Sequence, residues 1–124
     1  MGEIILKEES YKLIGLCMEV HRQLGMGFKE IVYKDALEIE LQEAGIPFER
    51  EKLYKIEYKN RTLRHKYCAD FVVYGSIILE AKSTPVIVNR FVAETLNYLK
   101  ASGLQLGIIA NFGQSSFVSK RIVF

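Results

Sequence analysis

Two acidic residues and one lysine stand in segments that otherwise have the apolar character of buried β-strands. Asp70 precedes one apolar run, Glu80 follows the next, and Lys82 lies two residues beyond Glu80. Glu80 and Lys82 therefore project from the same face of a strand. Carboxylates among apolar neighbours are partly desolvated, which costs free energy unless a metal cation or an ammonium compensates their charge. The residue types thus indicate either a divalent-cation site or an ion pair.

The loop between the two strands decides whether Asp70 shares that face. A two-residue loop would place Asp70 and Glu80 on opposite faces of the hairpin, whereas a three-residue loop over residues 73–75 would place them on one face. Gly75 suits the left-handed position of the longer loop, and the shorter loop would need Tyr74 at positive φ. We expect the longer loop. The cluster that it predicts consists of Asp70, Glu80, Lys82 and Cys68.

This cluster has the chemistry of a magnesium or manganese site. Asp70, Glu80 and the backbone carbonyl of Ala81 would supply oxygen ligands, which Mg²⁺ and Mn²⁺ prefer. Lys82 could then orient or deprotonate a water molecule, or stabilise a pentavalent phosphate. The alternative is a cross-strand salt bridge between Lys82 and one of the carboxylates, without a metal. The spacing alone leaves both interpretations open.

The elements that must position the cluster follow from periodicity and turn signals. Helices are predicted over residues 10–24, 28–44 and 88–102. Strands are predicted over residues 48–58, 62–73, 76–81, 104–111 and 117–124. Ser10 is the expected N-cap of the first helix, and Lys59-Asn60 reads as a turn between the first two strands. This order predicts an α/β fold in which helices flank a β-sheet.

Length and composition are those of one domain spanning residues 1–124. Hydrophobic residues make up 49% of the chain, enough for a core without disulfides or a structural metal. No apolar run is long enough to span a bilayer, and the acidic first ten residues do not resemble a signal peptide, so we expect a cytoplasmic protein. Cys17 and Cys68 lack metal-binding spacing and are expected to be reduced, partly buried thiols.

A basic stretch lies between Lys55 and Lys66, with only Glu57 opposing its charge. Such a patch could hold nucleic-acid phosphates, or it could be a solvated hairpin turn, which the sequence alone slightly favours. The net charge of +2 neither requires nor excludes a nucleic-acid partner. The candidate phosphate contacts are Lys59, Arg61, Arg64 and Lys66.

A resemblance to a known family covers almost the whole chain, from about Tyr11 to Val123. Residues 27–33 match the pattern G-x-x-E-x-x-Y, and Asp70 with residues 80–82 matches the pattern D-x(n)-[DE]-x-K. Further matching segments are residues 19–22, 96–103 and 111–113. The chain resembles the GxxExxY family of small bacterial and archaeal proteins, within the PD-(D/E)XK nuclease superfamily.

The resemblance implies an αβββαβ nuclease-like core around a mixed sheet, and a Mg²⁺- or Mn²⁺-dependent phosphodiesterase acting on nucleic acid. The residues it implies are Asp70 as the metal-binding acid, Glu80 as the second acid, Lys82 as the catalytic lysine and Glu30 as a helical acid before the sheet. Glu94 stands where the family usually has a glutamine. This fourth acid could bind a second ion, or it could mark a site no longer tuned to a polyanionic substrate.

Three further side chains are accessory candidates. Tyr98 lies four residues after Glu94 on the expected last helix and could hydrogen-bond to it. His21 could reach the site from the first helix, although a core histidine is the favoured interpretation. Tyr33 is interpreted as a packing residue whose hydroxyl has one partner.

Glu30 lies in the first turns of its helix, where the helix dipole favours a carboxylate in any case.

A second hypothesis belongs to a different functional class. The nuclease fold also hosts catalytically inactive modules, so the chain could be a nucleic-acid-binding or protein-adaptor module whose acidic cluster is a structural ion pair. With 124 residues there is little room for a separate DNA-reading element. A homodimer or a partner protein could therefore supply specificity.

Overall fold

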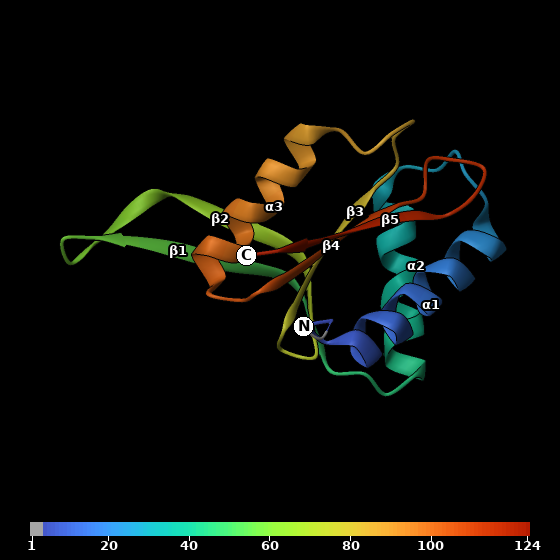
Figure 1. Cartoon of the computed structure of the whole chain (residues 1–124), viewed down its shortest axis with the longest axis horizontal. Helices are drawn as coiled ribbons and strands as arrows, with labels where there is room; N and C mark the ends of the chain where they lie inside the picture. The colour runs from blue at the N-terminus through green and yellow to red at the C-terminus, as the bar shows by residue number, and fades with distance from the viewer. Residues whose placement is uncertain (1–3) are drawn as a thin grey trace.

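The computed structural model describes residues 4–124, which form a five-stranded sheet with helices on both faces (Figure 1). The strands are β1 (Phe48–Tyr58), β2 (Arg61–Val73), β3 (Ile77–Lys82), β4 (Leu106–Asn111) and β5 (Val118–Val123). They lie in the order β1-β2-β3-β4-β5, with β3 and β4 parallel and the other neighbours antiparallel. The α/β fold with a mixed, helix-flanked sheet is therefore confirmed.

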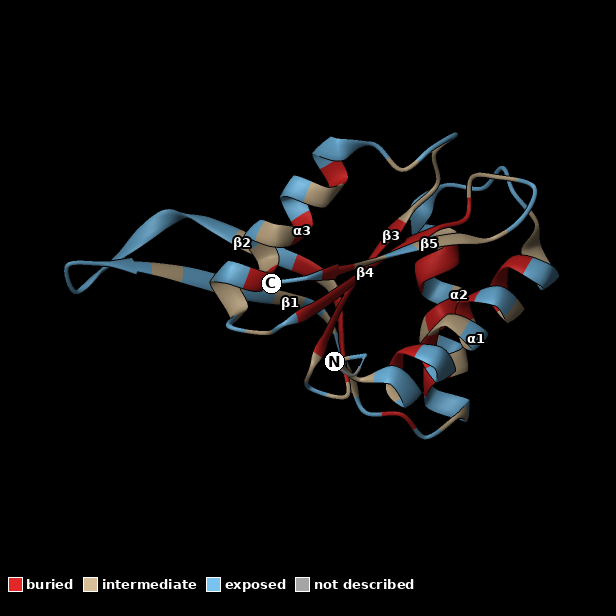
Figure 2. Ribbon diagram, viewed as in Figure 1, coloured by how far each residue is buried: buried red, intermediate tan, exposed pale blue. Residues whose placement is uncertain are grey.

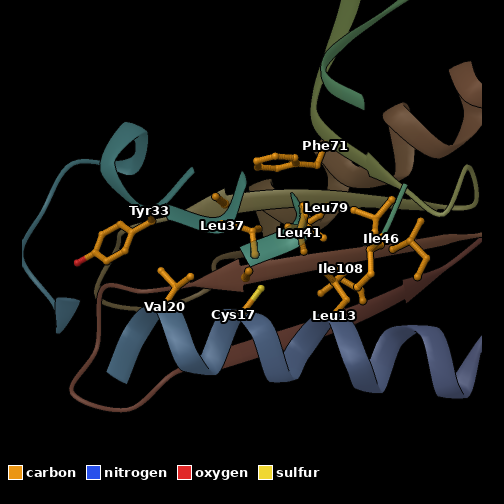
Figure 3. Packing of buried hydrophobic residues seen from close by; sticks show 14 of the residues in the cluster. Leu13, Cys17, Val20, Tyr33, Leu37, Leu41, Ile46, Phe71, Leu79 and Ile108 are labelled. Atoms are coloured by element: carbon orange, nitrogen blue, oxygen red, sulfur yellow. The ribbon is translucent and has the colours of Figure 1, made fainter. Parts of the chain in front are cut away.

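Two apolar cores lie on the two faces of this sheet (Figure 2). Helices α1 (Lys7–Leu24) and α2 (Glu30–Glu43) pack on one face, where Leu13, Leu37 and Leu79 meet (Figure 3). Helix α3 (Asn89–Ser102) packs on the other face. Because β3 is buried on both faces, a charged residue in it is desolvated unless partners surround it.

Two expectations about the helix starts are wrong. The first helix begins at Lys7, and Ser10 lies inside it, where its hydroxyl donates to the Lys7 carbonyl instead of capping the helix. The second helix begins at Glu30 because Gly27 and Phe28 form a loop before it, with Gly27 at a φ of 111°. No helix in residues 4–124 combines the length and apolar character that crossing a membrane would need.

The β2–β3 turn is one residue later than predicted. Val73 pairs with Ile77, so the loop has three residues, but they are residues 74–76. Tyr74 has a φ of 59°, contrary to the expectation that it would avoid the left-handed region, and Gly75 follows it with a φ of 65°. The predicted loop length was correct, and the resulting register places Asp70 opposite Glu80.

The β1–β2 hairpin extends beyond the body of the molecule as a two-stranded arm, defined here as residues 57–66 (Figures 1 and 2). All ten residues of the arm are exposed. Lys59 and Asn60 form its tip with φ angles of 47° and 63°, which confirms the predicted turn as a tight two-residue one. The arm therefore contributes no core of its own.

Gly113 marks a close approach between the chain after β4 and the chain after β3. A Cβ atom there would lie 2.2 Å from the Thr84 nitrogen, so Gly113→Ala should force the two backbones apart and destabilise the fold by about 1–3 kcal/mol. Gly15→Ala is the matched control, because a Cβ on that α1 residue meets nothing within 4 Å and should stabilise the helix by up to about 1 kcal/mol. Urea unfolding measures both, and equal midpoints would contradict the packing described.

Candidate active site

Asp70 and Glu80 lie where strands β2 and β3 separate. The last residue pair of the β2–β3 ladder is Phe71 with Leu79. Beyond it, the Asp70 N–H donates to Glu80 Oε2 at 2.9 Å, and the Ala81 N–H donates to Asp70 Oδ2 at 2.8 Å. Each carboxylate thus accepts the hydrogen bond that a backbone carbonyl of the opposite strand would otherwise accept. The side chain of each acid therefore bonds to the backbone of the opposite strand, and the two acids lie close together in the sheet.

Glu80 is the more buried of the two acids, with 5% of its surface exposed. Burial raises its pKa to about 8, and the nearby charge of Asp70 adds to the effect. The hydrogen bond from the Asp70 N–H and the charges of Lys82 and Lys34 act in the opposite direction but do not outweigh burial. Glu80 therefore keeps its proton at neutral pH when no metal cation is bound.

Lys34 of α2 contacts Asp70, and sequence reasoning missed it. Its ammonium lies 3.0 Å from Asp70 Oδ1 and donates a further hydrogen bond to Glu51 of β1. Burial alone would lower the pKa of Lys34, but the bonds to Glu51 and Asp70 more than compensate, so that the pKa is raised. A signal was present: Lys34 precedes the buried Leu37 and Leu41 by three and seven residues, the spacing of a core-facing position.

Lys82 faces α3 rather than the two acids. Its Nζ atom lies 3.5 Å from Glu94 Oε1 and 4.4 Å from the centroid of the Phe91 ring, which suits a cation–π contact. The predicted alternative, a cross-strand ion pair from Lys82 to one of the carboxylates, is wrong, because the ammonium that pairs with Asp70 belongs to Lys34. The fourth acid, Glu94, is thus the partner of the lysine.

The sequence predicts that Tyr98 and Cys68 join this cluster, but in the structure both lie at its border. The half-buried Tyr98 packs edge-on against Tyr67, with 5.6 Å between ring centroids, and among the contacts of residues 4–124 its hydroxyl makes no bond to Glu94. Burial, with the negative charges of Glu80, Asp70 and Glu94, raises the pKa of Tyr98. Cys68 is exposed rather than partly buried, and its thiol lies 3.5 Å from a Glu51 oxygen. Neither residue reaches Asp70 through a hydrogen bond.

Tyr33 and His21 are structural residues. Tyr33 is fully buried, and its hydroxyl donates to the Gly25 carbonyl at 2.7 Å and accepts from the Phe28 N–H at 3.2 Å. Its ring stacks on Phe112 at 4.6 Å. The His21 ring lies against Phe112 with its Nε2 atom 2.8 Å from the Gln114 carbonyl oxygen. These contacts agree with the packing interpretation of both residues, except that the Tyr33 hydroxyl has two partners instead of the one expected.

Glu30 also lies apart from the two acids. It is exposed in the first turn of α2 and lines a cavity of about 500 Å³ together with Ser83 and Thr84, the residues that follow β3. This cavity adjoins the end of the strand that carries Lys82. Glu30 therefore lies beside the residues that follow β3, and the structure does not place it at Asp70 or Glu80.

The basic candidates lie on the arm. Lys59, Arg61, Arg64 and Lys66 are all exposed there, and the one acid among them, Glu57, accepts a hydrogen bond from the Thr62 hydroxyl at 2.7 Å. At the base of the arm Lys55 pairs directly opposite Lys66. Two like charges across a ladder destabilise a hairpin, so this pair would gain from an anion nearby.

The two acids fit a divalent cation that keeps water ligands. No cluster of three or more acidic, histidine or cysteine residues able to hold an ion occurs in residues 4–124. The Ala81 N–H points into the strand split, and the N–H and carbonyl of one strand residue point to the same side, so the Ala81 carbonyl opens there too. Two carboxylates, one carbonyl and water form a donor set that Mg²⁺ accepts.

The raised pKa of Glu80 predicts the pH dependence of stability. In EDTA, unfolding releases the Glu80 proton between the ordinary carboxyl pKa of 4.5 and about 8, so the free energy of unfolding should fall as pH rises through this window. The slope is at most about 1.4 kcal/mol per pH unit. Glu80→Gln, which keeps an acceptor for the Asp70 N–H, should abolish the fall. Urea unfolding from pH 5 to 8 tests this, with the exposed Glu43→Gln as control; parallel profiles for wild type and Glu80→Gln would contradict it.

Comparisons with known proteins agree with this architecture. The crystal structure of SSO0001 superposes with a TM-score of 0.60 at 18% sequence identity, over 76% of this chain and 50% of that chain, so this chain spans about half the length of that structure and shares its fold. No curated protein matches the chain. The family model described as PD-(D/E)XK nuclease superfamily matches residues 7–122. The chain therefore belongs to the PD-(D/E)XK nuclease superfamily.

Proposed function

We propose that this chain is a Mg²⁺- or Mn²⁺-dependent nuclease that hydrolyses phosphodiester bonds of nucleic acid. The observation that carries the proposal is the pair of carboxylates, Asp70 and Glu80, held side by side at the split between β2 and β3. Membership of a nuclease superfamily supports it. We also propose that the chain belongs to the narrower GxxExxY group, because residues 27–33 carry that pattern.

Asp70, Glu80 and the Ala81 carbonyl would hold the cation. Its chemistry would be to polarise the scissile phosphoryl group and to lower the pKa of a bound water. The reciprocal hydrogen bonds to Asp70 and Glu80 fix both carboxylates before a substrate arrives, which avoids the cost of ordering them during the reaction.

Lys82 would act on the phosphate. Its ammonium is held between Glu94 and the Phe91 ring, on the same face of β3 as Glu80. From there it would donate to a phosphate oxygen or orient the attacking water as negative charge develops. Glu94 would position this ammonium, a role that an acid can fill at the position where the resemblance implies a glutamine. Glu30, beside the cavity after β3, would be an accessory acid.

The arm would bind the nucleic-acid backbone. Its basic residues are exposed and carry little opposing charge, and a two-stranded β-ribbon is narrow enough to follow a groove of duplex nucleic acid. The Lys55–Lys66 pair at its base would be neutralised by phosphates. Specificity could come from a homodimer or a partner protein.

Replacing Lys82 tests the catalytic part of the proposal. Lys82→Met should lower the rate of Mn²⁺-dependent cleavage of DNA or RNA by about 10²-fold or more, because the charge that stabilises the transition state is lost. Folding should be spared, since the side chain is partly exposed. Lys120→Met, on the exposed side of β5, is the matched control. Cleavage that Lys82→Met leaves at the wild-type rate would refute the assigned role.

Replacing the arm lysines and arginines tests the binding part. Changing Lys59, Arg61, Arg64 and Lys66 to glutamine should weaken binding of a labelled oligonucleotide, measured by fluorescence anisotropy in EDTA. The salt slope should fall by about one for each phosphate contact removed. The control changes Lys7 and Lys12 of α1, which are equally exposed. An identical slope in the arm variant would place the binding surface elsewhere.

The ion pair between Lys34 and Asp70 favours a second candidate function. An ammonium already compensates Asp70, so the cluster could serve as a structural ion pair in a catalytically inactive binding module. In that case the wild-type protein would bind nucleic acid or a partner protein but would show no cleavage with Mg²⁺ or Mn²⁺. The cleavage assay above therefore separates the two candidates.

A further inference from the structure

Lys34 is a buried cation that the proposed chemistry leaves without a role. Its side chain is 10% exposed, and its ammonium contacts two carboxylates, Asp70 and Glu51. Burying a lysine costs free energy unless its charge is paired, so these two acids are what allows Lys34 to lie in α2 facing the sheet. The contact joins α2 and β1 to the point where β2 and β3 separate.

Glu51 adopts an unusual backbone conformation at this contact. Its φ of 57° lies in the left-handed region, in the interior of an 11-residue strand, where a residue with a side chain is rarely found. The β1–β2 ladder omits Glu51 and resumes at Lys52. Conformations of this kind persist where surrounding contacts require them, and here the contact is the one to the Lys34 ammonium.

Asp70 does not depend on Lys34 for its orientation. Its second oxygen, Oδ2, accepts the Ala81 N–H at 2.8 Å, and this bond does not involve the ammonium. The effect of Lys34 on a cation at Asp70 is therefore mainly electrostatic. One positive charge 3.0 Å from Oδ1 repels a divalent ion that binds the same carboxylate, and at a partly buried position this repulsion is only partly screened.

We propose that Lys34 is an internal counter-ion that competes with Mg²⁺ or Mn²⁺ for Asp70 and so weakens metal binding by the free protein. The inference rests on the proposed function, which places the cation at Asp70. Without metal, Lys34 compensates the acid and stabilises the strand split. A site that is weak for the free ion would be filled most readily when a nucleic-acid phosphate supplies further oxygen ligands.

The test is calorimetric titration of the full chain with Mn²⁺, which needs no substrate. Lys34→Met and Lys34→Gln both remove the charge, and each should lower the Kd for Mn²⁺ by about tenfold or more. Lys34→Gln keeps a hydrogen-bond donor and serves if the methionine variant unfolds. Lys34→Arg keeps the charge and should stay near the wild-type Kd, as should Lys12→Met on the exposed side of α1.

The outcomes separate this inference from the proposed function. Binding that disappears in Asp70→Ala while the neutral Lys34 variants keep the wild-type Kd, or bind more weakly, overturns the competition and leaves the metal site intact. Mn²⁺ binding that is seen only in the neutral Lys34 variants supports the proposal, because Lys34 then excludes the ion completely from the wild-type protein. Absence of Mn²⁺ binding in the wild type and in every Lys34 variant overturns both the competition and the proposed metal site. Melting temperatures in EDTA show which variants are folded.

Discussion

The reciprocal hydrogen bonds at the strand split are the constraint on which the site depends. A pair of strands that separates leaves backbone N–H groups without carbonyl partners, and burial makes such groups costly. Here the carboxylates of Asp70 and Glu80 accept those bonds, so the two acids satisfy the backbone and are fixed by it at once. The site therefore consists of two carboxyl groups, one buried and one partly buried, that cannot move independently of the sheet.

The helices on the two faces of the sheet supply charged partners for the ionisable side chains at the strand split. From one face, α2 brings the Lys34 ammonium to Asp70. From the other face, α3 brings Glu94 and Phe91 to Lys82, so that the second cation is held on the side of the sheet where Glu80 projects. The charge of an ionised Glu80 is not fully compensated, because burial outweighs the effect of its partners and raises its pKa to about 8. A divalent cation at the site would stabilise the ionised carboxylate.

The sequence predicted the fold and the acidic pair because both depend on local rules. Periodicity and glycine positions located all eight elements, and the parity of a three-residue loop was enough to predict that Asp70 and Glu80 share a face of the hairpin. The exact loop residues were wrong, since Tyr74 adopts a left-handed conformation that propensity disfavours. Nothing local reveals that Lys34 pairs with Asp70, because that contact depends on how α2 crosses the sheet.

The same limit applies to the residues around the site. The pairing of Lys82 with Glu94 joins a strand and a helix that meet only in the tertiary structure. Glu51 was overlooked because no sequence rule anticipates a left-handed residue inside a strand. By contrast, His21 was interpreted as a core residue from its place on an apolar helix face and Tyr33 as a packing residue from its residue type, and the contacts of both agree with this.

The most direct test of the account is a crystal of the protein soaked in Mn²⁺ and measured for anomalous scattering. We predict one strong anomalous peak at the split between β2 and β3, within bonding distance of an oxygen from Asp70, an oxygen from Glu80 and the Ala81 carbonyl. A map without a peak there at saturating Mn²⁺, in crystals of the wild type and of Lys34→Gln alike, would contradict the metal site and leave a structural ion pair in its place.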